Sequence, residues 1–356
     1  MTKIYNIAVI PGDGIGVEVV AEGIKVLRTV EELDCSVNFD FRYFDWGCDY
    51  YKKTGKMMPD DGLQLLKHFD AIYLGAVGSK TVPDSISLRE LLLKIRVGFD
   101  QYVNLRPVKL LKGAFTPLKN KTHQDIDFVV VRENTEGEYC GLGEWIDDGL
   151  STERVRQISQ FTKKGTERII RYAFQLAKRE GKTKVTSVTK DNALNYSMVF
   201  WNKIFAEVSK DYPEISTEQL MVDACSMLFV TQPERFEVVV ASNLFGDILT
   251  DLGAAIAGGI GLAVGDNINP EGVFPSMFES IHGSAPDIAG KGIANPMAQI
   301  WAAADMLKHF GLSFWHDKII CAFESLLEEK KVLTPDLGGI ATTTQLGDEI
   351  CRLLKK

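Results

Sequence analysis

Short apolar runs rich in β-branched residues recur along the chain, at residues 7–10, 71–74, 128–131, 184–188 and 238–241. Runs of this length predict buried strands. Between them, apolar residues return at helical spacing, as at Val17, Val20, Ala21, Ile24 and Leu27, and at Ile170, Ala173, Phe174 and Ala177. Strands that alternate with helices in this way are typical of an α/β fold with a largely parallel sheet.

The length of the chain bears on how these elements are grouped. A chain of 356 residues exceeds a single ordinary core, so we expect two lobes or one large α/β unit. There is no internal repeat, no low-complexity tract and no Pro-, Gly- or Ser-rich linker. Any second lobe is therefore expected to be connected to the first through the same sheet.

Composition and charge narrow the function classes. Hydrophobic residues make up 45% of the chain and charged residues 25%, which is the balance of a globular protein rather than of a disordered or membrane protein. The formal net charge is -8, and no segment places Lys and Arg among aromatic residues, so no nucleic-acid partner is expected. No apolar run reaches transmembrane length, and the N-terminal segment lacks the apolar core of a signal peptide, so we expect no membrane association.

The cysteines give no sign of a metal cluster or a disulfide framework. All six stand singly, without a CxxC spacing: Cys35, Cys48, Cys140, Cys225, Cys321 and Cys351. Such scattered cysteines are typical of reduced thiols in the cytosol. The sequence therefore predicts a cytoplasmic protein.

A glycine-rich segment, Gly12-Asp13-Gly14-Ile15-Gly16, follows the first predicted strand and opens the first predicted helix. A dinucleotide fingerprint has its third glycine three residues after the second, whereas here it comes two residues after. Asp13 would also repel a phosphate. The spacing favours a tight strand-to-helix turn over a phosphate-binding loop.

Two aspartates follow the last of the buried runs. The run ends near Asn243, which we expect to cap a helix, and that helix places Asp247 and Asp251 four residues apart on one face. Like charges at this spacing destabilise a helix by a few tenths of a kcal/mol, at roughly the same magnitude as a favourable pair stabilises it. A hard cation such as Mg²⁺ or Mn²⁺ would turn the repulsion into coordination. From spacing alone, a solvated acidic face fits equally well.

Further polar residues are candidates for metal binding, substrate binding or proton transfer only if the fold brings them together. Asp223 lies in an apolar stretch, where a lone charge is costly unless it is paired or metal-bound, although it could equally be a surface residue of a half-buried strand. Arginine is suited to binding carboxylates with two parallel hydrogen bonds, and Tyr and Lys can transfer protons near a cation. The candidates are Arg96, Arg106, Arg132, Tyr139 and Lys190.

A loop rich in Gly, Ala and Pro occurs late in the chain. It runs from Glu279 to Gly290, with Asn295-Pro296 shortly after, and its small residues would let backbone N–H groups approach a ligand. Taken alone, His282 within this loop would be a structural histidine.

Taken together, these motifs are similar to those of the β-decarboxylating dehydrogenases, the isocitrate/isopropylmalate dehydrogenase family. The match runs from residues 11–16 to the Thr-rich residues 341–344, and six motifs appear in the family's order. The resemblance implies an α/β, isopropylmalate-dehydrogenase-like two-lobed fold with a long shared mixed sheet, and not a Rossmann domain. It places residues 1–103 and 259–356 in a larger cofactor-binding lobe and residues 104–258 in a smaller lobe for dimerisation and substrate binding.

The resemblance also implies roles for individual residues. Asp223, Asp247 and Asp251 would hold Mg²⁺ or Mn²⁺, with Asp223 supplied by the neighbouring subunit of a homodimer. Tyr139 and the neighbour's Lys190 would carry the proton transfers, and Asn192 would lie near the nicotinamide. Arg96, Arg106 and Arg132 would bind the substrate carboxylates. The adenosine side of the cofactor would contact His282, Gly283, Ser284, Ala285, Pro286, Asp287 and Asn295.

The choice of cofactor depends on Asp287. It stands where NAD-using members of the family carry an acid for the adenosine ribose hydroxyls, whereas NADP-using members tend to carry a lysine. Because a carboxylate would repel a 2′-phosphate, the resemblance implies NAD.

The substrate is expected to be a small 2-hydroxy dicarboxylate that is oxidised at C2 and then loses CO₂. Several segments resemble the tartrate/D-malate branch of the family most closely, among them residues 46–51, 55–59, 101–107 and 132–139. Leu92 and Leu93, on the helix leading to Arg96, would also suit an isopropyl group, so isopropylmalate is the alternative substrate. The tartrate/D-malate branch carries a tryptophan and a glycine where this chain has Arg89 and Glu90. A homologue without activity is disfavoured because every matched catalytic position is intact.

Overall fold

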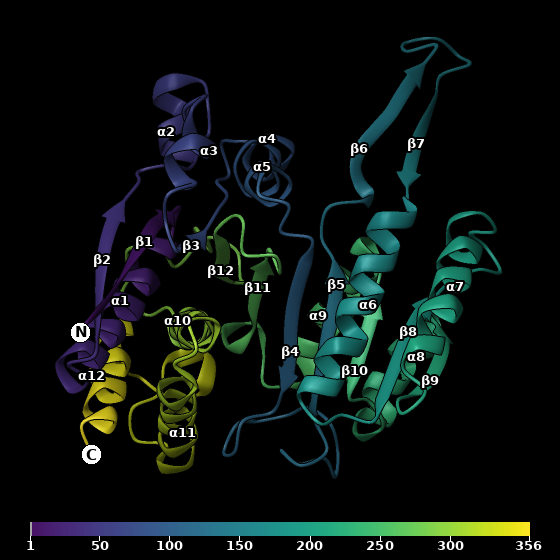
Figure 1. The fold of residues 1–356 in the computed structure, drawn as a ribbon. Helices are drawn as coiled ribbons and strands as arrows, with labels where there is room; N and C mark the ends of the chain where they lie inside the picture. Colours follow the sequence, from purple (N-terminus) through teal and green to yellow (C-terminus); the bar gives the residue numbers. More distant parts are fainter. Residues whose placement is uncertain (1) are drawn as a thin grey trace. The chain divides into compact units, whose positions relative to one another are not determined.

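The computed structural model describes residues 2–356, which divide into two compact units. Unit 1 consists of the chain up to Gln101, of Lys109–His123 and of Ala254–Lys356, and unit 2 of Tyr102–Val108 and Gln124–Gly253. The ten strands of the large mixed sheet are divided equally between the units, and helices surround the strands in both (Figure 1). The expected α/β fold class is confirmed. No helix among residues 2–356 is long and apolar enough to cross a membrane.

The strands of unit 1 follow the order β2-β1-β3-β12-β11. All pairs are parallel except β12 with β11, which is antiparallel. The strands are β1 (Lys3–Gly12), β2 (Val37–Tyr43), β3 (Ala71–Ala76), β11 (Val264–Ile268) and β12 (Ser276–Ser280). Every residue of β3, β11 and β12 is buried, as expected for strands covered on both faces.

The helices of unit 1 are α1 (Gly16–Leu33), α2 (Cys48–Thr54), α3 (Gly62–Leu66), α4 (Asp84–Ser87), α5 (Leu93–Gly98), α10 (Met297–His309), α11 (Ser313–Glu329) and α12 (Thr343–Leu354). Helix α10 is buried from Met297 to Leu307 and is attached to β3 by two hydrogen bonds. The Tyr73 hydroxyl donates to the Gln299 carbonyl at 2.6 Å, and the Gln299 amide donates to the Leu74 carbonyl at 2.9 Å. Helix α12 begins with a capping box formed by Thr342 and Gln345.

The helix predicted after the first strand is present as α1, but not all of the residues predicted to be buried on it are buried. Val20, Ile24 and Leu27 are buried, whereas Val17 and Ala21 are exposed. The buried face is centred on Val19, Gly23 and Val26, nearly half a turn away from Val17. Gly23 is needed on that face, because a Cβ there would lie 1.8 Å from the Tyr73 hydroxyl oxygen.

The strands of unit 2 follow the order β4-β5-β10-β8-β9, and the pairs of β10 with β5, β10 with β8 and β8 with β9 are parallel. They are β4 (Val103–Lys109), β5 (Asp127–Glu133), β8 (Lys184–Thr189), β9 (Ser216–Met221) and β10 (Val238–Ala241). The helices are α6 (Lys163–Arg179), α7 (Ser197–Val208), α8 (Val222–Thr231) and α9 (Asn243–Ile256). The predicted apolar face of α6, from Ile170 to Ala177, is buried against the sheet.

An antiparallel hairpin of β6 (Gly137–Ile146) and β7 (Arg154–Gln160) forms a separate two-stranded sheet in unit 2. In Figure 1 it extends away from the helices and strands of its own unit. All of β7 is exposed, and Trp145, Val155 and Ile158 present apolar side chains to solvent. The hairpin was not among the elements predicted from the sequence.

Candidate active site

The glycine-rich turn between β1 and α1 is a structural junction. Asp13 is buried, and its carboxylate accepts hydrogen bonds from the backbone N–H groups of Cys48 at 2.8 Å and Gly78 at 2.9 Å. These bonds occupy both of its oxygens within the protein. The prediction of a tight turn, rather than a phosphate-binding loop, agrees with this arrangement.

This turn also supports the loop between β12 and α10. The backbone N–H of Ile15 donates to the Ser284 carbonyl at 2.9 Å, and a Cβ on Gly14 would lie 2.0 Å from the same carbonyl oxygen. Gly14 adopts φ +56°, a backbone conformation that glycine tolerates and other residues avoid. Ala285 in the loop has φ +39°, an uncommon value for a residue with a Cβ. The loop is therefore held at a fixed position against the start of α1.

His282 and Asn295 flank this loop and are both buried. Burial lowers the pKa of the His282 imidazole, so the neutral form is favoured, and its Nδ1 lies 3.1 Å from the Gly283 carbonyl. Its Nε2 is buried without a hydrogen-bond partner among residues 2–356. A buried polar atom of this kind is rare unless a ligand or water satisfies it, so the site fits a polar ligand such as a nucleoside. The Asn295 amide donates to Asp336 at 2.9 Å.

Asp287 lies at the exposed edge of the same loop and forms an ion pair with Lys80 at 2.5 Å. The hydrogen bond from Lys80, and then its positive charge, lower the pKa of the Asp287 carboxyl. Gly283 and Pro286 are exposed as well, whereas Ser284 is buried. The loop thus presents a carboxylate and backbone groups to solvent beside a buried histidine.

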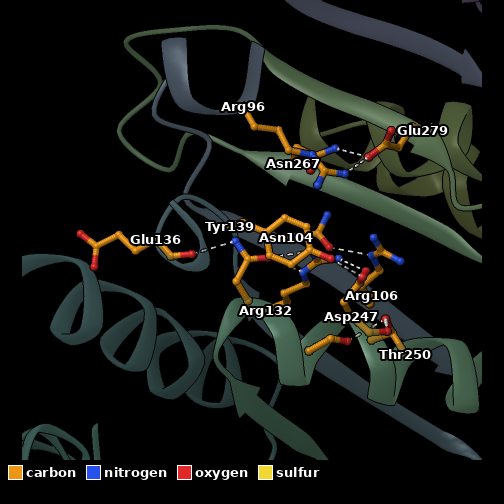
Figure 2. A network of polar contacts seen from close by, with 12 residues as sticks. Arg96, Asn104, Arg106, Arg132, Glu136, Tyr139, Asp247, Thr250, Asn267 and Glu279 are labelled. Atoms are coloured by element: carbon orange, nitrogen blue, oxygen red, sulfur yellow. Dashed lines mark hydrogen bonds and ion pairs between the residues drawn. The ribbon is translucent and has the colours of Figure 1, made fainter. Parts of the chain in front are cut away.

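Arg96 is buried and forms an ion pair with Glu279 of β12 at 2.6 Å, an interaction visible in Figure 2. The Asn267 amide donates to the same Glu279 oxygen at 2.8 Å. A buried guanidinium is costly unless its charge is compensated, and Glu279 supplies that compensation. Glu279 stood within a motif noted in the sequence, yet no role was predicted for it. The feature of the sequence that could have pointed to Glu279 is a carboxylate directly after the apolar residues Met277 and Phe278.

The segment before Arg96 contains one π-helical turn, Leu88–Leu92, between α4 and α5. The backbone N–H of Leu93 donates to the Leu88 carbonyl five residues earlier. Single π turns of this kind occur often at functional sites. Leu92 and Leu93 are half-buried, while Arg89 and Glu90 are exposed and, within the described chain, pair with no other charge.

In unit 2, Arg132 at the end of β5 connects the first turns of α9 to the hairpin. Its guanidinium forms an ion pair with Asp247 (Figure 2). It also donates to the side-chain oxygen of Asn243 at 2.7 Å. The Tyr139 hydroxyl donates to the other Asp247 oxygen at 2.7 Å, and the guanidinium lies 5.4 Å from the centre of the Tyr139 ring. The predicted capping role of Asn243 is wrong, because its carboxamide binds Arg132 and the Glu136 carbonyl instead.

Asp251 lies one turn after Asp247 on α9. Partial desolvation and the negative charge of Asp247 raise the pKa of the Asp251 carboxyl, against the opposing charges of Arg106 and Arg132. The two carboxylates thus share one helix face, as the spacing predicted, and a divalent cation would relieve their repulsion. Arg106 on β4 is buried, and its Nε donates to the Asn104 side-chain oxygen at 2.6 Å (Figure 2).

Lys190 follows β8 and forms an ion pair with Asp223 at 3.1 Å. Asp223 is the second residue of α8 and is exposed, so the alternative of a half-buried strand is wrong. The hydrogen bond from Lys190 lowers the pKa of the Asp223 carboxyl. Asn192 is exposed two residues after Lys190. A pocket of about 400 Å³ lies nearby, and its lining includes Ser159, Phe161 and residues 193–197 but none of the predicted site residues.

Most of the predicted residues therefore gather in four groups. In unit 1 these are the loop from His282 to Asp287 with Asn295, and Arg96 with its partners. In unit 2 they are the cluster of Arg132, Tyr139, Asp247 and Asp251, and the pair of Lys190 with Asp223. Within residues 2–356 no three His, Cys, Asp or Glu side chains are grouped so that they could hold a metal ion.

The chain is similar to known proteins over nearly its whole length. Residues 6–350 match the protein family described as isocitrate/isopropylmalate dehydrogenase. The chain is 51% identical to D-malate dehydrogenase [decarboxylating] of Escherichia coli (strain K12), with 99% of each chain covered. It is 50% identical to tartrate dehydrogenase/decarboxylase of Pseudomonas putida, with 99% of this chain and 98% of that protein covered. Among solved structures, isocitrate dehydrogenase from Methylococcus capsulatus matches with a TM-score of 0.89 and 38% identity, over 99% of this chain and 100% of that one.

Proposed function

Because the chain belongs to the isocitrate/isopropylmalate dehydrogenase family, a family of oxidoreductases, we propose that it oxidises D-malate or tartrate with NAD and a divalent metal. The 2-keto acid formed from D-malate would then lose CO₂. The observation that carries the proposal is the identity of 51% and 50% to a D-malate and a tartrate dehydrogenase over nearly the full chain. All six cysteines are free thiols, which supports a cytoplasmic location for the protein.

The metal is proposed to bind Asp247 and Asp251. Their carboxylates suit Mg²⁺ or Mn²⁺, which take oxygen ligands and retain positions for water and substrate. Two carboxylates alone make an incomplete ligand set, so we propose that Asp223 of the partner subunit completes it in a homodimer. The exposure of Asp223 at the first turn of α8 supports this, because an exposed carboxylate can reach a second chain.

Three arginines are proposed to hold the two carboxylates of the substrate. Arg96 and Arg106 are buried and positioned by Glu279 and Asn104, respectively. Arg132 is fixed by Asn243 and Asp247. A guanidinium that is already oriented loses less conformational entropy when it binds a carboxylate, which favours a tight substrate complex. Leu92 and Leu93 are proposed to contact the substituent at C3.

Bound NAD would supply the hydride acceptor at C2, and bound Mg²⁺ or Mn²⁺ would supply positive charge beside the C2 hydroxyl and the developing carbonyl. Lys190 of the partner subunit is proposed to take the proton of that hydroxyl. Tyr139 is proposed to return a proton to the carbon that has lost CO₂. The Tyr139 hydroxyl donates to Asp247, which orients its proton, and the Arg132 guanidinium lies 5.4 Å from the centre of the Tyr139 ring.

The cofactor is proposed to bind along the loop from His282 to Asp287. His282 Nε2 would gain the partner that it lacks, Asp287 would accept from the ribose hydroxyls, and Asn295 would contact the adenine. Asn192 is proposed to lie near the nicotinamide. A carboxylate at position 287 favours NAD over NADP.

One assay tests the proposal. NADH formation is followed with D-malate, meso-tartrate, L-tartrate, isopropylmalate and isocitrate, each with Mn²⁺ and with a chelator. We expect D-malate or a tartrate to give the highest kcat/KM and the chelator to abolish turnover. Turnover of isopropylmalate far above D-malate would favour the alternative suggested by Leu92 and Leu93. Activity that survives the chelator would contradict the metal site.

The metal ligands are tested separately by binding. Asp251→Asn should weaken Mn²⁺ binding by roughly tenfold or more, since one charged ligand is lost. Glu328→Gln on α11 removes an exposed carboxylate elsewhere and should leave Mn²⁺ binding unchanged.

A further inference from the structure

A turn after β8 carries Lys190 and Asn192. Its backbone is closed by two hydrogen bonds to the Lys190 carbonyl, from the N–H groups of Ala193 at 3.1 Å and Leu194 at 2.8 Å. Residues 192–196 are all exposed, so solvent rather than packing surrounds this part of the turn. The direction of the Lys190 side chain therefore depends on the side-chain contacts that fix the turn.

Asp191, between Lys190 and Asn192, makes such a contact. The carboxamide nitrogen of Asn202 on α7 donates to Asp191 Oδ2 at 2.9 Å. Both side chains are half-buried, which strengthens the bond relative to one in open water. The carboxamide oxygen of Asn202 is buried and has no hydrogen-bond partner among residues 2–356, so it is the bond to Asp191 that orients this side chain.

Asn202 is a fixed point because the helix that carries it is attached to the sheet. The neighbouring Trp201 is fully buried, and its indole N–H donates to the Ser187 hydroxyl of β8 at 2.9 Å. The Trp201 ring also packs edge-to-face against Phe161, with the ring centres 6.4 Å apart. The bond between Asn202 and Asp191 therefore ties the turn to a well-packed part of unit 2.

We propose that Asp191 and Asn202 are positioning residues for Lys190, because their hydrogen bond holds the turn where Lys190 Nζ can reach the substrate hydroxyl. This role rests on the proposed function, in which Lys190 takes the proton of the C2 hydroxyl in the active site of the partner subunit. A proton acceptor has to lie within hydrogen-bond distance of the proton that it takes. A displacement of about 1 Å can lower a rate by roughly a hundredfold.

The ion pair of Lys190 with Asp223 does not replace this contact. Asp223 is proposed to be a metal ligand, so in the assembled site its carboxylate is shared with the cation. Asp191 and Asn202 bind neither the metal nor the substrate in the proposed function. Their hydrogen bond can therefore persist while Asp223 serves the metal.

The first test breaks the hydrogen bond and then restores it in reverse. Asn202→Asp sets two carboxylates against each other and should lower kcat by roughly tenfold with whichever of D-malate or the tartrates the wild type oxidises best. Combining it with Asp191→Asn places the amide on the turn and the carboxylate on the helix, and should return kcat close to the wild-type value. KM should change less than kcat, because the three arginines are proposed to bind the substrate carboxylates.

Two further variants guard this test. Asp191→Ala removes the same contact from the turn without adding a charge to α7, and should lower kcat to a similar extent. It decides the matter if circular dichroism shows that Asn202→Asp does not fold. Glu207→Gln removes an exposed carboxylate of α7 and should leave kcat unchanged.

A hybrid dimer gives a readout that a general loss of folding would not. Because Lys190 is proposed to act in the partner's site, the defect of Asp191→Ala should appear in the site of the other chain. A purified hybrid of an Asp191→Ala chain with a Tyr139→Phe chain would have one site with both substitutions and one with neither. It should therefore show about half of the wild-type activity. A hybrid no more active than the Asp191→Ala homodimer would overturn the positioning of Lys190.

The outcomes separate the positioning role from the function on which it rests. An active wild type with unchanged kcat in Asp191→Ala would overturn the role and leave the proposed function standing. A folded double variant no more active than a folded Asn202→Asp would overturn it as well. If the wild type oxidises none of the 2-hydroxy dicarboxylates, the proposed function and the positioning role are both wrong.

Discussion

Arg96 donates a hydrogen bond of 2.6 Å to Glu279, and the two side chains are only 5% and 7% exposed. Removing one partner of a buried pair leaves the other charge without compensation, which costs more than the pair itself contributes. Glu279 therefore determines both the stability of this part of unit 1 and the direction in which the Arg96 guanidinium points.

We predict that Glu279→Ala lowers the free energy of unfolding by about 3 kcal/mol, because the guanidinium of Arg96 stays buried without its counter-charge. Urea denaturation at neutral pH measures the change. Glu328→Ala, which removes one partner of the exposed ion pair with Lys112, serves as the control and should have little effect. An equal loss of stability in the two variants would contradict the prediction.

A comparison of Gly14 with Gly55 separates two costs of adding a side chain: the strain of a positive φ, and the clash of a Cβ with neighbouring atoms. Both have positive φ, +56° and +75°, but a Cβ on Gly14 would lie 2.0 Å from the Ser284 carbonyl, whereas a Cβ on Gly55 would meet nothing within 4 Å. We predict that Gly55→Ala costs about 1 kcal/mol and that Gly14→Ala costs at least about 1 kcal/mol more. Thermal or urea denaturation measures both.

Gly14→Ala should also weaken 5′-AMP, since the Ser284 carbonyl has to move and the loop with it. Gly55→Ala should leave that affinity unchanged. If Gly14→Ala binds 5′-AMP as well as the wild type does, the contact of the glycine-rich turn with the Ser284 carbonyl is not needed for adenosine binding.

His316 should make the stability of unit 1 depend on pH. Burial alone would lower the pKa of the imidazole, and Lys308 acts in the same direction, but the contacts with Asp305 at 3.2 Å and Asp317 at 2.8 Å outweigh them and raise it above 6.5. The protonated form is therefore favoured in the folded state. Its contribution is fully present below pH 6.5, the value for the unfolded chain, and is lost as the pH rises through the raised pKa of the folded state.

We predict that His316→Gln removes this pH dependence. The difference in unfolding free energy between wild type and variant should be largest near pH 6 and should shrink as the pH approaches about 9. Urea denaturation over this range measures it, with His123→Gln at an exposed position as the control. A difference that grows with pH would show that the sign is wrong.

Hybrid dimers test whether Lys190 acts across subunits. Tyr139→Phe and Lys190→Met should each be inactive as homodimers. In a purified hybrid of the two, one site would carry both substitutions and the other neither, so about half of the wild-type activity should return. If Lys190 served the site of its own chain, each site would keep one substitution and the hybrid would be inactive.

The local pattern of residues was enough to predict much of the architecture. The five apolar runs became β1, β3, β5, β8 and β10, and the glycine-rich segment became a tight turn at the start of α1. The spacing of Asp247 and Asp251 placed both on one face of α9. Strand propensity, helical periodicity and turn chemistry act over a few residues, so they can be read without knowing the fold.

Other features depended on contacts that no local pattern records. The exposure of Val17 and Ala21 on α1, the hairpin of β6 and β7, and the helical setting of Asp223 could not be read from the local pattern. The sequence by itself determined the strands, the helices and the residue types available for chemistry. Only the tertiary structure decided that Arg96 meets Glu279 183 residues away and that Lys80 meets Asp287 207 residues away, because such contacts exist only once folding brings distant segments together.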